Sequence, residues 1–430
     1  MVTVLFIVGL AVAAFVGYNI GGSSTGVAFG PAVGSRITGK VVAGLLFTGF
    51  ALLGGWTVGR EVIETMGGEI VPANEFTLAA SVVILFFTGL SLLISNLYGV
   101  PASTSMTAVG AIVGLGVATD SLNEAVMFGI VSAWIVSPLV AFWIGVIIGR
   151  YIYPYLDARV SFGRIKDGLF QFDRSGAVPR PVLKEEATLR DAAGAAVVLV
   201  VACYNAFSAG ASNTANAVAP LVGSNAITVE QGVLLAAGAI GIGALTIARR
   251  TLDTVGDDIT DLPILAAILV SLVGATIITV LSGLGIPASL AVSMTSCIIG
   301  LGWGRASRAV TLAEVASAAI EGEGGPDLSA GALVAAGAED AGGHDANSAP
   351  TPAPGPTVGD LAASETPNES VAGDRDAAAE PVPKIGEESP EVLTAEDLFD
   401  RAATGRIVTL WLLTPTISAI GSYLVFALGF

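Results

Sequence analysis

Charged residues, cysteine and histidine are scarce in this chain. Of its 430 residues only 13% are charged, 53% are hydrophobic, and the mean hydropathy is +0.77. The two cysteines, Cys203 and Cys297, and the one histidine, His344, are too few for a disulfide framework or a Cys/His metal cluster. A soluble domain of this length carries far more charge, so the composition predicts an integral membrane protein.

Apolar runs of about a bilayer's thickness recur along the chain. Because one helical crossing needs about 20 apolar residues, we expect an all-α membrane protein with about ten segments, some of them broken or re-entrant. The first run has no basic segment before it and no cleavage site after it, so we expect it to stay in the mature protein. The runs cover residues 2–16, 41–57, 77–97, 104–119, 123–149, 192–207, 231–248, 262–282, 286–303 and 407–430.

One segment has a different composition. Residues 309–400 are rich in Gly, Ala, Pro and Ser and hold 19 acidic and two basic residues, so that 17 acidic and 17 basic residues remain elsewhere. A segment of this kind buries too little apolar surface to fold, and we predict an acidic disordered linker. The predicted units are a first membrane repeat (1–150), a basic connector (151–190), a second membrane repeat (191–308), the acidic linker (309–403) and a final membrane helix of the second repeat (404–430).

The chain repeats itself. GGSSTGVAFGPAVGS at Gly21–Ser35 aligns with GASNTANAVAPLVGS at Gly210–Ser224, with eight of fifteen positions identical. The same offset of 189 residues carries Thr57–Ile70 onto Thr246–Ile259. Two halves with matching Gly-rich motifs predict a duplicated transporter with its site at the repeat interface.

The placement of basic residues predicts the orientation of the segments. With the connector in the cytoplasm, all other basic clusters next to membrane segments except Arg60 fall on that side if the crossings alternate. Both termini are then extracellular and the linker cytoplasmic. Each half has an odd number of crossings, about five, so the two repeats are inverted. The basic clusters are Arg36 with Lys40, Arg249 with Arg250, Arg305 with Arg308, and Arg401 with Arg406.

Small polar residues interrupt the apolar pattern at equivalent places in the two halves. We predict that they break the helices there, because irregular backbone at membrane depth is tolerated where it is buried or lines a wet cavity. An oxyanion could bind at the helix ends through N–H groups and hydroxyls, without a buried cation. The alternative is close helix packing through small residues. The candidate residues are Ser23, Ser24, Thr25, Ser103, Thr104, Ser105, Ser212, Asn213, Asn216, Ser293, Thr295 and Ser296.

A second duplicated motif carries charge. Arg60 and Glu64, like Arg249 and Asp253, are four residues apart, so each pair shares one face of a helix. The functional interpretation is a charged gate at each mouth of the protein. The alternative is an interfacial salt bridge at a helix end, which contributes little stability.

At these motifs the sequence resembles the inorganic phosphate transporter family known as PiT, which also contains sulfate permeases. GASNTANAVAPL at Gly210–Leu221 is similar to the family's GANDVANA motif, and Gly21–Pro31 matches it remotely. PASTSM at Pro101–Met106 is similar to the family's PxSTTH motif, and SMTS at Ser293–Ser296 echoes it without the proline. The resemblance covers both membrane halves and implies that the candidate hydroxyls and amides surround the anion.

The chain departs from the family pattern at its acidic positions. The motif aspartates are replaced by Ser24 and Asn213, and the motif histidines by Met106 and Ser296. Family members that couple to sodium are thought to use those aspartates, so the coupling cation, sodium or proton, stays open. A site without carboxylates would also repel a dianion such as sulfate less.

Together the sequence predicts a secondary transporter, a symporter of inorganic phosphate across the cytoplasmic membrane by alternating access. A sulfate permease, a passive anion channel and a transport-inactive anion receptor stay open as alternatives. An enzyme is the weakest interpretation, because the membrane region has no nucleophile with a base, no metal cluster and no nucleotide loop. The expected partners are an inorganic oxyanion and the lipid bilayer, with no nucleic acid, no cofactor and no metal; a homodimer is left open.

Overall fold

The computed structural model describes most of both predicted membrane regions. Nearly all of the described residues are helical, and a short antiparallel hairpin pairs Phe170–Asp173 with Arg180–Leu183. Most of the predicted linker lies outside the described residues. These residues are 2–98, 103–159, 170–173, 180–183, 189–248, 264–307 and 401–429.

The described elements follow the predicted apolar runs. In the first part of the chain they are α1 (Val2–Gly34), α2 (Lys40–Thr57), α3 (Gly59–Glu64), the π-helical η1 (Thr65–Glu69), the 3₁₀ turn η2 (Ala73–Glu75), α4 (Leu78–Leu97), α5 (Thr104–Ala118), α6 (Glu124–Ile147), the π-helical η3 (Ile148–Ile152) and α7 (Tyr153–Arg159). In the second part they are β1 (Phe170–Asp173), β2 (Arg180–Leu183), α8 (Leu189–Gly223), α9 (Val229–Thr246), α11 (Ile264–Gly283), α12 (Leu290–Ala306) and α16 (Arg401–Ala427).

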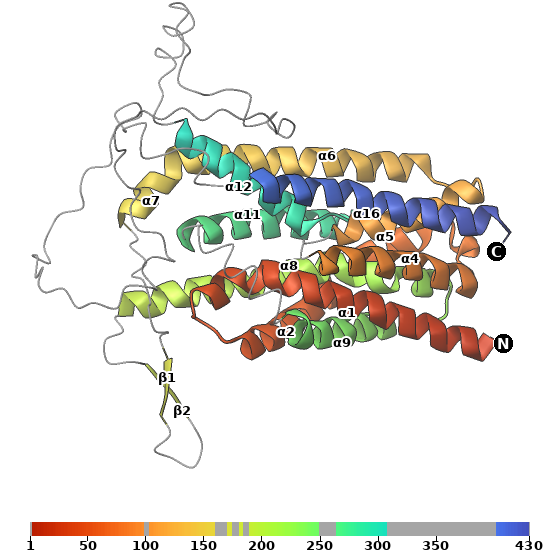
Figure 1. The fold of residues 1–430 in the computed structure, drawn as a ribbon, viewed down its shortest axis with the longest axis horizontal. Helices are drawn as coiled ribbons and strands as arrows, with labels where there is room; N and C mark the ends of the chain where they lie inside the picture. Colours follow the sequence, from red (N-terminus) through yellow and green to blue (C-terminus); the bar gives the residue numbers. More distant parts are fainter. Residues whose placement is uncertain are drawn as a thin grey trace, which may run out of the picture.

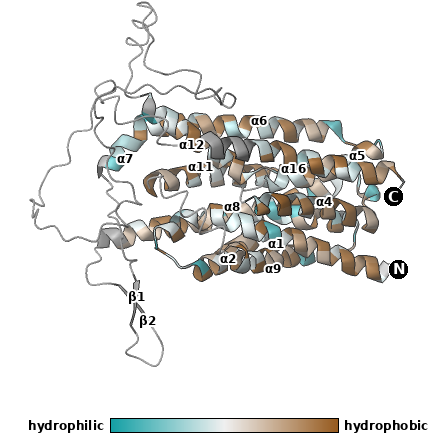
Figure 2. Ribbon diagram, viewed as in Figure 1, coloured by the Kyte–Doolittle hydropathy of each residue, from teal (hydrophilic) through white to brown (hydrophobic). Residues whose placement is uncertain are grey.

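The helix bundle has an apolar outer surface. Eight of the described helices are long and apolar enough to cross a membrane, and α5 is a shorter apolar helix. Large side chains such as Phe128, Trp143 and Leu412 are 77%, 60% and 70% exposed on it. Figure 2 shows hydrophobic colour along the whole length of the bundle. So much exposed apolar surface is typical of lipid contact, and the prediction of a helical, multi-pass membrane protein is confirmed.

The predicted breaks in the helices of the Gly21 and Gly210 motifs are wrong. Helices α1 and α8 run through both motifs without interruption. The hydroxyls of Thr25 and Thr214 donate to carbonyls four residues earlier in their own helices, each at 2.7 Å. The motif glycines serve the alternative role, close helix packing.

The two halves pack their helices in the same way. α1 packs on α9 as α8 packs on α2, and α5 packs on α16 as α12 packs on α6. At the crossings, Gly21 lies against the backbone of Ile240, and Gly210, its repeat equivalent, lies against the backbone of Ala51. A Cβ atom at either glycine would overlap that backbone, so the motif glycines set how closely these helices approach.

The start of α5 and the turn between α11 and α12 meet inside the bundle. Figure 1 shows α4 and α5 toward the end that holds both termini, and α11 and α12 toward the opposite end. The Ser105 hydroxyl at the start of α5 donates to the carbonyl of Ala288 just before α12, at 3.0 Å, and Ser212 from the middle of α8 donates to the same oxygen at 2.6 Å. The indole of Trp134 in α6 holds the carbonyl of Pro287 at 2.7 Å. The first turns of α5 and α12 therefore converge beside α8.

Candidate functional site

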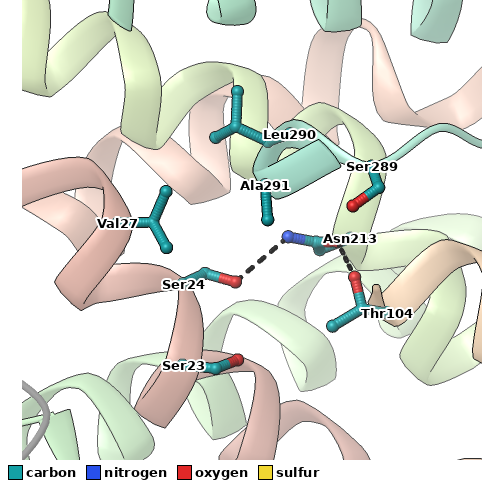
Figure 3. A pocket seen from close by; sticks show the side chains of 8 residues that line it. All are labelled: Ser23, Ser24, Val27, Thr104, Asn213, Ser289, Leu290 and Ala291. Carbon is teal, nitrogen blue, oxygen red and sulfur yellow. Dashed lines mark hydrogen bonds between the residues drawn. The ribbon is translucent and has the colours of Figure 1, made fainter. Parts of the chain in front are cut away.

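A cavity lies where α1, α8 and the first turns of α5 and α12 meet. The space between its lining atoms, which is continuous with open solvent, is about 320 Å³. Figure 3 shows its lining side chains turned toward one another across the space. The lining contains hydroxyls, one amide and apolar groups, and none of its members is charged. They are Ser23, Ser24, Val27, Thr104, Asn213, Ser289, Leu290 and Ala291.

The two halves meet directly in this cavity. Ser24 and Asn213 are repeat equivalents, 189 positions apart, and the amide nitrogen of Asn213 donates to the Ser24 hydroxyl at 3.3 Å. Ser23 and Val27 stand four residues apart on α1, so that both face the same space as Ser24. The duplicated motif thus brings its own two copies together.

A buried hydrogen-bond network holds Asn213 in place. The Thr104 hydroxyl donates to the oxygen of Asn213 at 2.5 Å, and the amide nitrogen of Asn216 lies 3.1 Å from the same oxygen. The Asn216 amide nitrogen also lies 3.2 Å from the hydroxyls of Thr104 and of Ser105. With its oxygen occupied, Asn213 presents its NH₂ group toward Ser24 and the cavity.

Two helix N-termini supply further donors. Leu290 and Ala291 are the first residues of α12, where the backbone N–H groups have no partner within the helix. Ser289 caps this helix by accepting from the N–H of Val292 at 3.4 Å. Thr104 begins α5 in the same position. The positive ends of two helix dipoles therefore point into a neutral cavity, an arrangement that favours an anion.

The structure brings most of the predicted residues together. Ser23, Ser24, Thr104 and Asn213 line the cavity, and four more candidates lie in or beside the network behind it. These four are Ser103, Ser105, Ser212 and Asn216, each at most 1% exposed.

Other predicted residues lie away from the cavity lining. Thr25 is completely buried and bonded to its own helix, and Ser293 is buried on α12 with no partner for its hydroxyl in the described part of the chain. Thr295 and Ser296 are half-buried farther along α12. The sequence analysis aligned Ser293–Ser296 with the motif at the start of α5. In the structure α12 begins at Leu290, about one turn before these residues.

That earlier start explains the residues that the sequence analysis missed. PASL at Pro287–Leu290 repeats PAST at Pro101–Thr104, so that Ser289 takes the place of Ser103 before its helix. This short repeat could have identified Ser289, Leu290 and Ala291. Nothing in the sequence marked Val27 as a cavity residue, because an apolar residue in an apolar helix is expected to pack against other helices or lipid.

The charged motif forms a different ion pair from the one predicted. Arg60 contacts Glu230 at the start of α9 at 3.1 Å, with the two side chains 32% and 51% exposed. The Arg60 guanidinium lies 4.9 Å from the centre of the Trp56 ring, and its Nε donates to the Trp56 carbonyl at 2.8 Å. These contacts turn it toward α2 and α9, away from Glu64. Arg249 and Asp253 lie outside the described residues.

Within the described ranges, no group of three or more His, Cys, Asp or Glu side chains could hold a metal ion. The cavity's only side-chain ligands are neutral hydroxyls and one amide. Hydroxyl and N–H donors in a neutral pocket are suited to an anion.

Comparisons with known proteins identify similar chains. Residues 20–321 match the model of the phosphate transporter family. The sulfate permease CysP of Bacillus subtilis is 33% identical over 289 residues, which is 67% of this chain and 74% of that protein. A putative phosphate permease of Pyrococcus furiosus is 25% identical over 377 residues, 72% of this chain and 88% of that one. Among solved structures, the sodium-dependent phosphate transporter has a similar fold, with a TM-score of 0.57, 21% identity, and 70% of this chain and 90% of that chain covered.

Proposed function

The chain belongs to the phosphate transporter family, and we propose that it is a secondary transporter that moves inorganic phosphate across the cytoplasmic membrane by alternating access. The observation that carries the proposal is the neutral cavity lined by Asn213, Ser24 and the first turns of two helices. Hydrogen-bond donors and helix dipoles stabilise an oxyanion there, and the absence of a charged lining side chain lets the anion leave again.

Sulfate is the second candidate substrate, and one feature of the lining suits it. Phosphate keeps a proton near neutral pH, and its P–OH group needs an acceptor, whereas sulfate only accepts. No carboxylate lines the cavity, and the oxygen of Asn213 already accepts from Thr104, so serine and threonine hydroxyls are the acceptors left for a P–OH group. The 33% identity to a sulfate permease supports sulfate as the alternative substrate.

We propose that the two repeats are inverted in the membrane, with the α4–α5 and α11–α12 hairpins re-entrant from opposite sides. Three observations support this topology. The helix pairs of the two halves pack alike, the two hairpins lie toward opposite ends of the bundle, and the starts of α5 and α12 meet beside Ser212 of α8. If each half can adopt the packing arrangement that its counterpart has here, the cavity would open first to one side of the membrane and then to the other.

The proposed orientation has both termini outside and the linker inside. Arg36, Arg150 and Arg305 follow or end α1, α6 and α12, and these helix ends lie opposite the two termini in Figure 1. Basic residues gathered at one end are typical of the cytoplasmic side.

Uptake by liposomes containing the purified full-length protein tests the function. Labelled phosphate and labelled sulfate are offered in parallel under imposed sodium and proton gradients. We expect accumulation of one anion, lost in Asn213→Leu and retained in Thr416→Val, a control whose side chain is exposed on α16 and bonded only to its own helix. Accumulation against a gradient distinguishes a coupled carrier from a passive channel. Binding without flux would identify a receptor, and neither binding nor flux of either anion would refute the oxyanion proposal.

A further inference from the structure

The turn between α11 and α12 leads into the helix whose first residues line the cavity. Residues 286–289 of this turn are not helical, and the last three of them are buried. A buried carbonyl outside a helix needs a hydrogen-bond donor from elsewhere in the protein, because the interior of a membrane supplies no water. The donors that meet this turn therefore determine where the N–H groups at the start of α12 point.

Three side chains donate to this turn. Ser105 and Ser212 both bond to the carbonyl of Ala288, and both lie in or beside the network behind the cavity. Trp134 of α6 bonds instead to the carbonyl of Pro287, with the indole nitrogen 2.7 Å from the oxygen. Trp134 is not a member of the cavity lining, so it can affect a bound anion only through the backbone of the turn.

The sequence around Trp134 occurs twice. WIVSP at 134–138 recurs as WLLTP at 411–415, so that Trp411 of α16 is the equivalent of Trp134. The offset here is 277 residues rather than 189, since the predicted linker lies between α12 and α16. The duplication therefore includes this tryptophan as well as the motifs of α1 and α8.

Helix packing supports this equivalence. Gly300 of α12 lies against the backbone of Phe142 in α6, and Gly114 of α5 lies against the backbone of Ala419 in α16. Phe142 and Ala419 are again 277 positions apart. The pairs α6–α12 and α16–α5 are therefore packed in the same register, and the two tryptophans occupy the same place in their pairs.

Trp411 lies level with the first turn of α5. One turn farther along both helices, the Thr107 hydroxyl of α5 donates to the Thr414 hydroxyl of α16 at 3.3 Å. The helices run in the same direction from there, and Gly110 and Gly114 meet the backbone of α16 one turn apart. Trp411 is 9% exposed, so its indole is buried beside the other helix start that faces the cavity.

We propose that Trp134 and Trp411 are positioning residues for the anion, and that each indole holds the start of an anion-facing helix from the other half of the protein. Helix α6 of the first half holds α12 of the second, and α16 of the second half holds α5 of the first. In this crossed arrangement neither half can change its helix packing without moving a helix start of the other. The inference rests on the proposed function, because the anion is what these helix starts would bind.

Positioning and simple stabilisation differ in what they change. The N–H groups at a helix start bind an anion well only when they are aimed at it. Loss of the indole bond leaves the Pro287 carbonyl without its donor and lets the turn shift, which lowers anion affinity. If the indole only satisfied a buried carbonyl, its loss would reduce the amount of folded protein and leave the affinity of the folded molecules unchanged.

Uptake by liposomes containing the full-length protein measures this difference through KM and the maximal rate, each normalised to folded protein. Trp134→Phe keeps an aromatic ring and removes the N–H donor. It should raise KM for the transported anion by about fivefold and leave the maximal rate nearly unchanged.

Trp134→His is the conservative variant for the hydrogen bond. Its Nε2 lies on a five-membered ring at the place of the indole nitrogen, and the ring is neutral at mildly alkaline pH. We expect it to restore KM to within about twofold of the original value, although the lost six-membered ring lowers stability.

The equivalent residue and a matched control complete the set. Trp411→Phe should raise KM by a similar factor, and in the double variant the two factors should multiply, because the tryptophans act on different helices. Trp143→Phe is the control, since this tryptophan is on the same helix as Trp134 and its side chain is 60% exposed on the apolar outer surface. Its KM should equal that of the unsubstituted protein.

Hydrogen exchange separates this inference from the proposed function. With no anion present, Trp134→Phe should speed amide exchange at the start of α12, and Trp143→Phe should not. Faster exchange in a protein that takes up neither phosphate nor sulfate would keep the holding of the turn by Trp134 and count against the proposed function. If Trp134→Phe fails to fold, benzothienylalanine at position 134 replaces it, because that side chain keeps the shape of tryptophan and carries sulfur in place of the N–H.

Four results would overturn the inference. An unchanged KM in Trp134→Phe, or an unchanged exchange rate at the start of α12, would mean that the indole does not position the turn. A KM in Trp134→His as high as in Trp134→Phe would mean that the bulk of the ring matters and the hydrogen bond does not. An unchanged KM in Trp411→Phe would remove the crossed arrangement of the two halves.

Discussion

The two halves of the molecule pack their helices in the same way, but they contribute different polar residues to the cavity. At the glycine crossings they are nearly interchangeable, because Gly21 and Gly210 lie against equivalent backbones. At the cavity they differ, since the equivalents of Asn213 and Asn216 in the first half are Ser24 and Val27. The close helix packing at the glycines is present in both halves. The amides of the cavity's hydrogen-bond network are present only in the second half.

The strongest test of the common helix packing is to replace the glycines at the helix crossings with a larger residue. Gly21→Ala and Gly210→Ala should each destabilise the protein by about 3 kcal/mol, because the new Cβ meets backbone that no rotamer change can move. The measurement is thermal or denaturant unfolding in detergent. Gly49→Ala and Gly238→Ala are the controls, since these glycines are also 189 positions apart and have open space where the Cβ would go. A clear difference between Gly21→Ala and Gly210→Ala would show that the halves are not packed alike.

Replacement of Asn216 by valine, the equivalent residue of the first half, tests the difference in polar residues between the halves. Asn216→Val removes the amide that contacts Thr104, Ser105 and Asn213, and should cost about 2 kcal/mol of stability as buried partners lose their bonds. Anion uptake should fall by about tenfold, because Asn213 is then held only by Thr104 and Ser24. Uptake and unfolding are measured on the same preparation. Unchanged uptake with lowered stability would mean that the network supports the fold alone.

A smaller effect is expected on the first-half side of the cavity. Ser24→Ala removes one neutral hydrogen bond, which corresponds to about 1 kcal/mol or roughly fivefold in anion affinity. The measurement is the concentration dependence of uptake in liposomes. A loss of anion uptake as severe as that in Asn213→Leu would contradict this expectation, and would mean that both copies of the motif contribute equally to anion binding.

The smallest effect is expected at the exposed ion pair. Arg60→Gln or Glu230→Gln should leave stability nearly unchanged, since both side chains are partly exposed to solvent. A double-mutant cycle should show only a small coupling free energy between the two side chains, because the pair is partly exposed to solvent. Uptake should also stay near its original value. A large loss of uptake without loss of stability would support the gate interpretation for Arg60.

The sequence predicted the helices better than the breaks between them. Apolar runs locate helices because lipid-facing segments must be apolar along their whole length. The Gly21 and Gly210 motifs resemble breaks in sequence, since glycine and serine are poor helix formers in water. In the bundle, neighbouring helices occupy the space that the small residues leave, and α1 and α8 stay continuous.

For the cavity, the sequence pointed to some of the residues that line it and not to others. Ser24, Thr104 and Asn213 are candidates that line the cavity, whereas the candidates Thr295 and Ser296 do not. A hydroxyl on a helix lines a cavity only if that face of the helix is turned toward it. The start of α12 at Leu290 determines that face for the second half.

The sequence by itself determined the membrane class, the duplication and the neutral chemistry of the candidate site, because these depend on composition and on spacing along the chain. Tertiary structure decided which side chains meet. It joined Ser24 to Asn213 across 189 positions, turned Arg60 toward Glu230, and left Asn205 buried without a hydrogen-bond partner among the described residues. Contacts of this kind depend on how helices far apart in sequence approach and rotate against one another, which no local pattern of residues specifies.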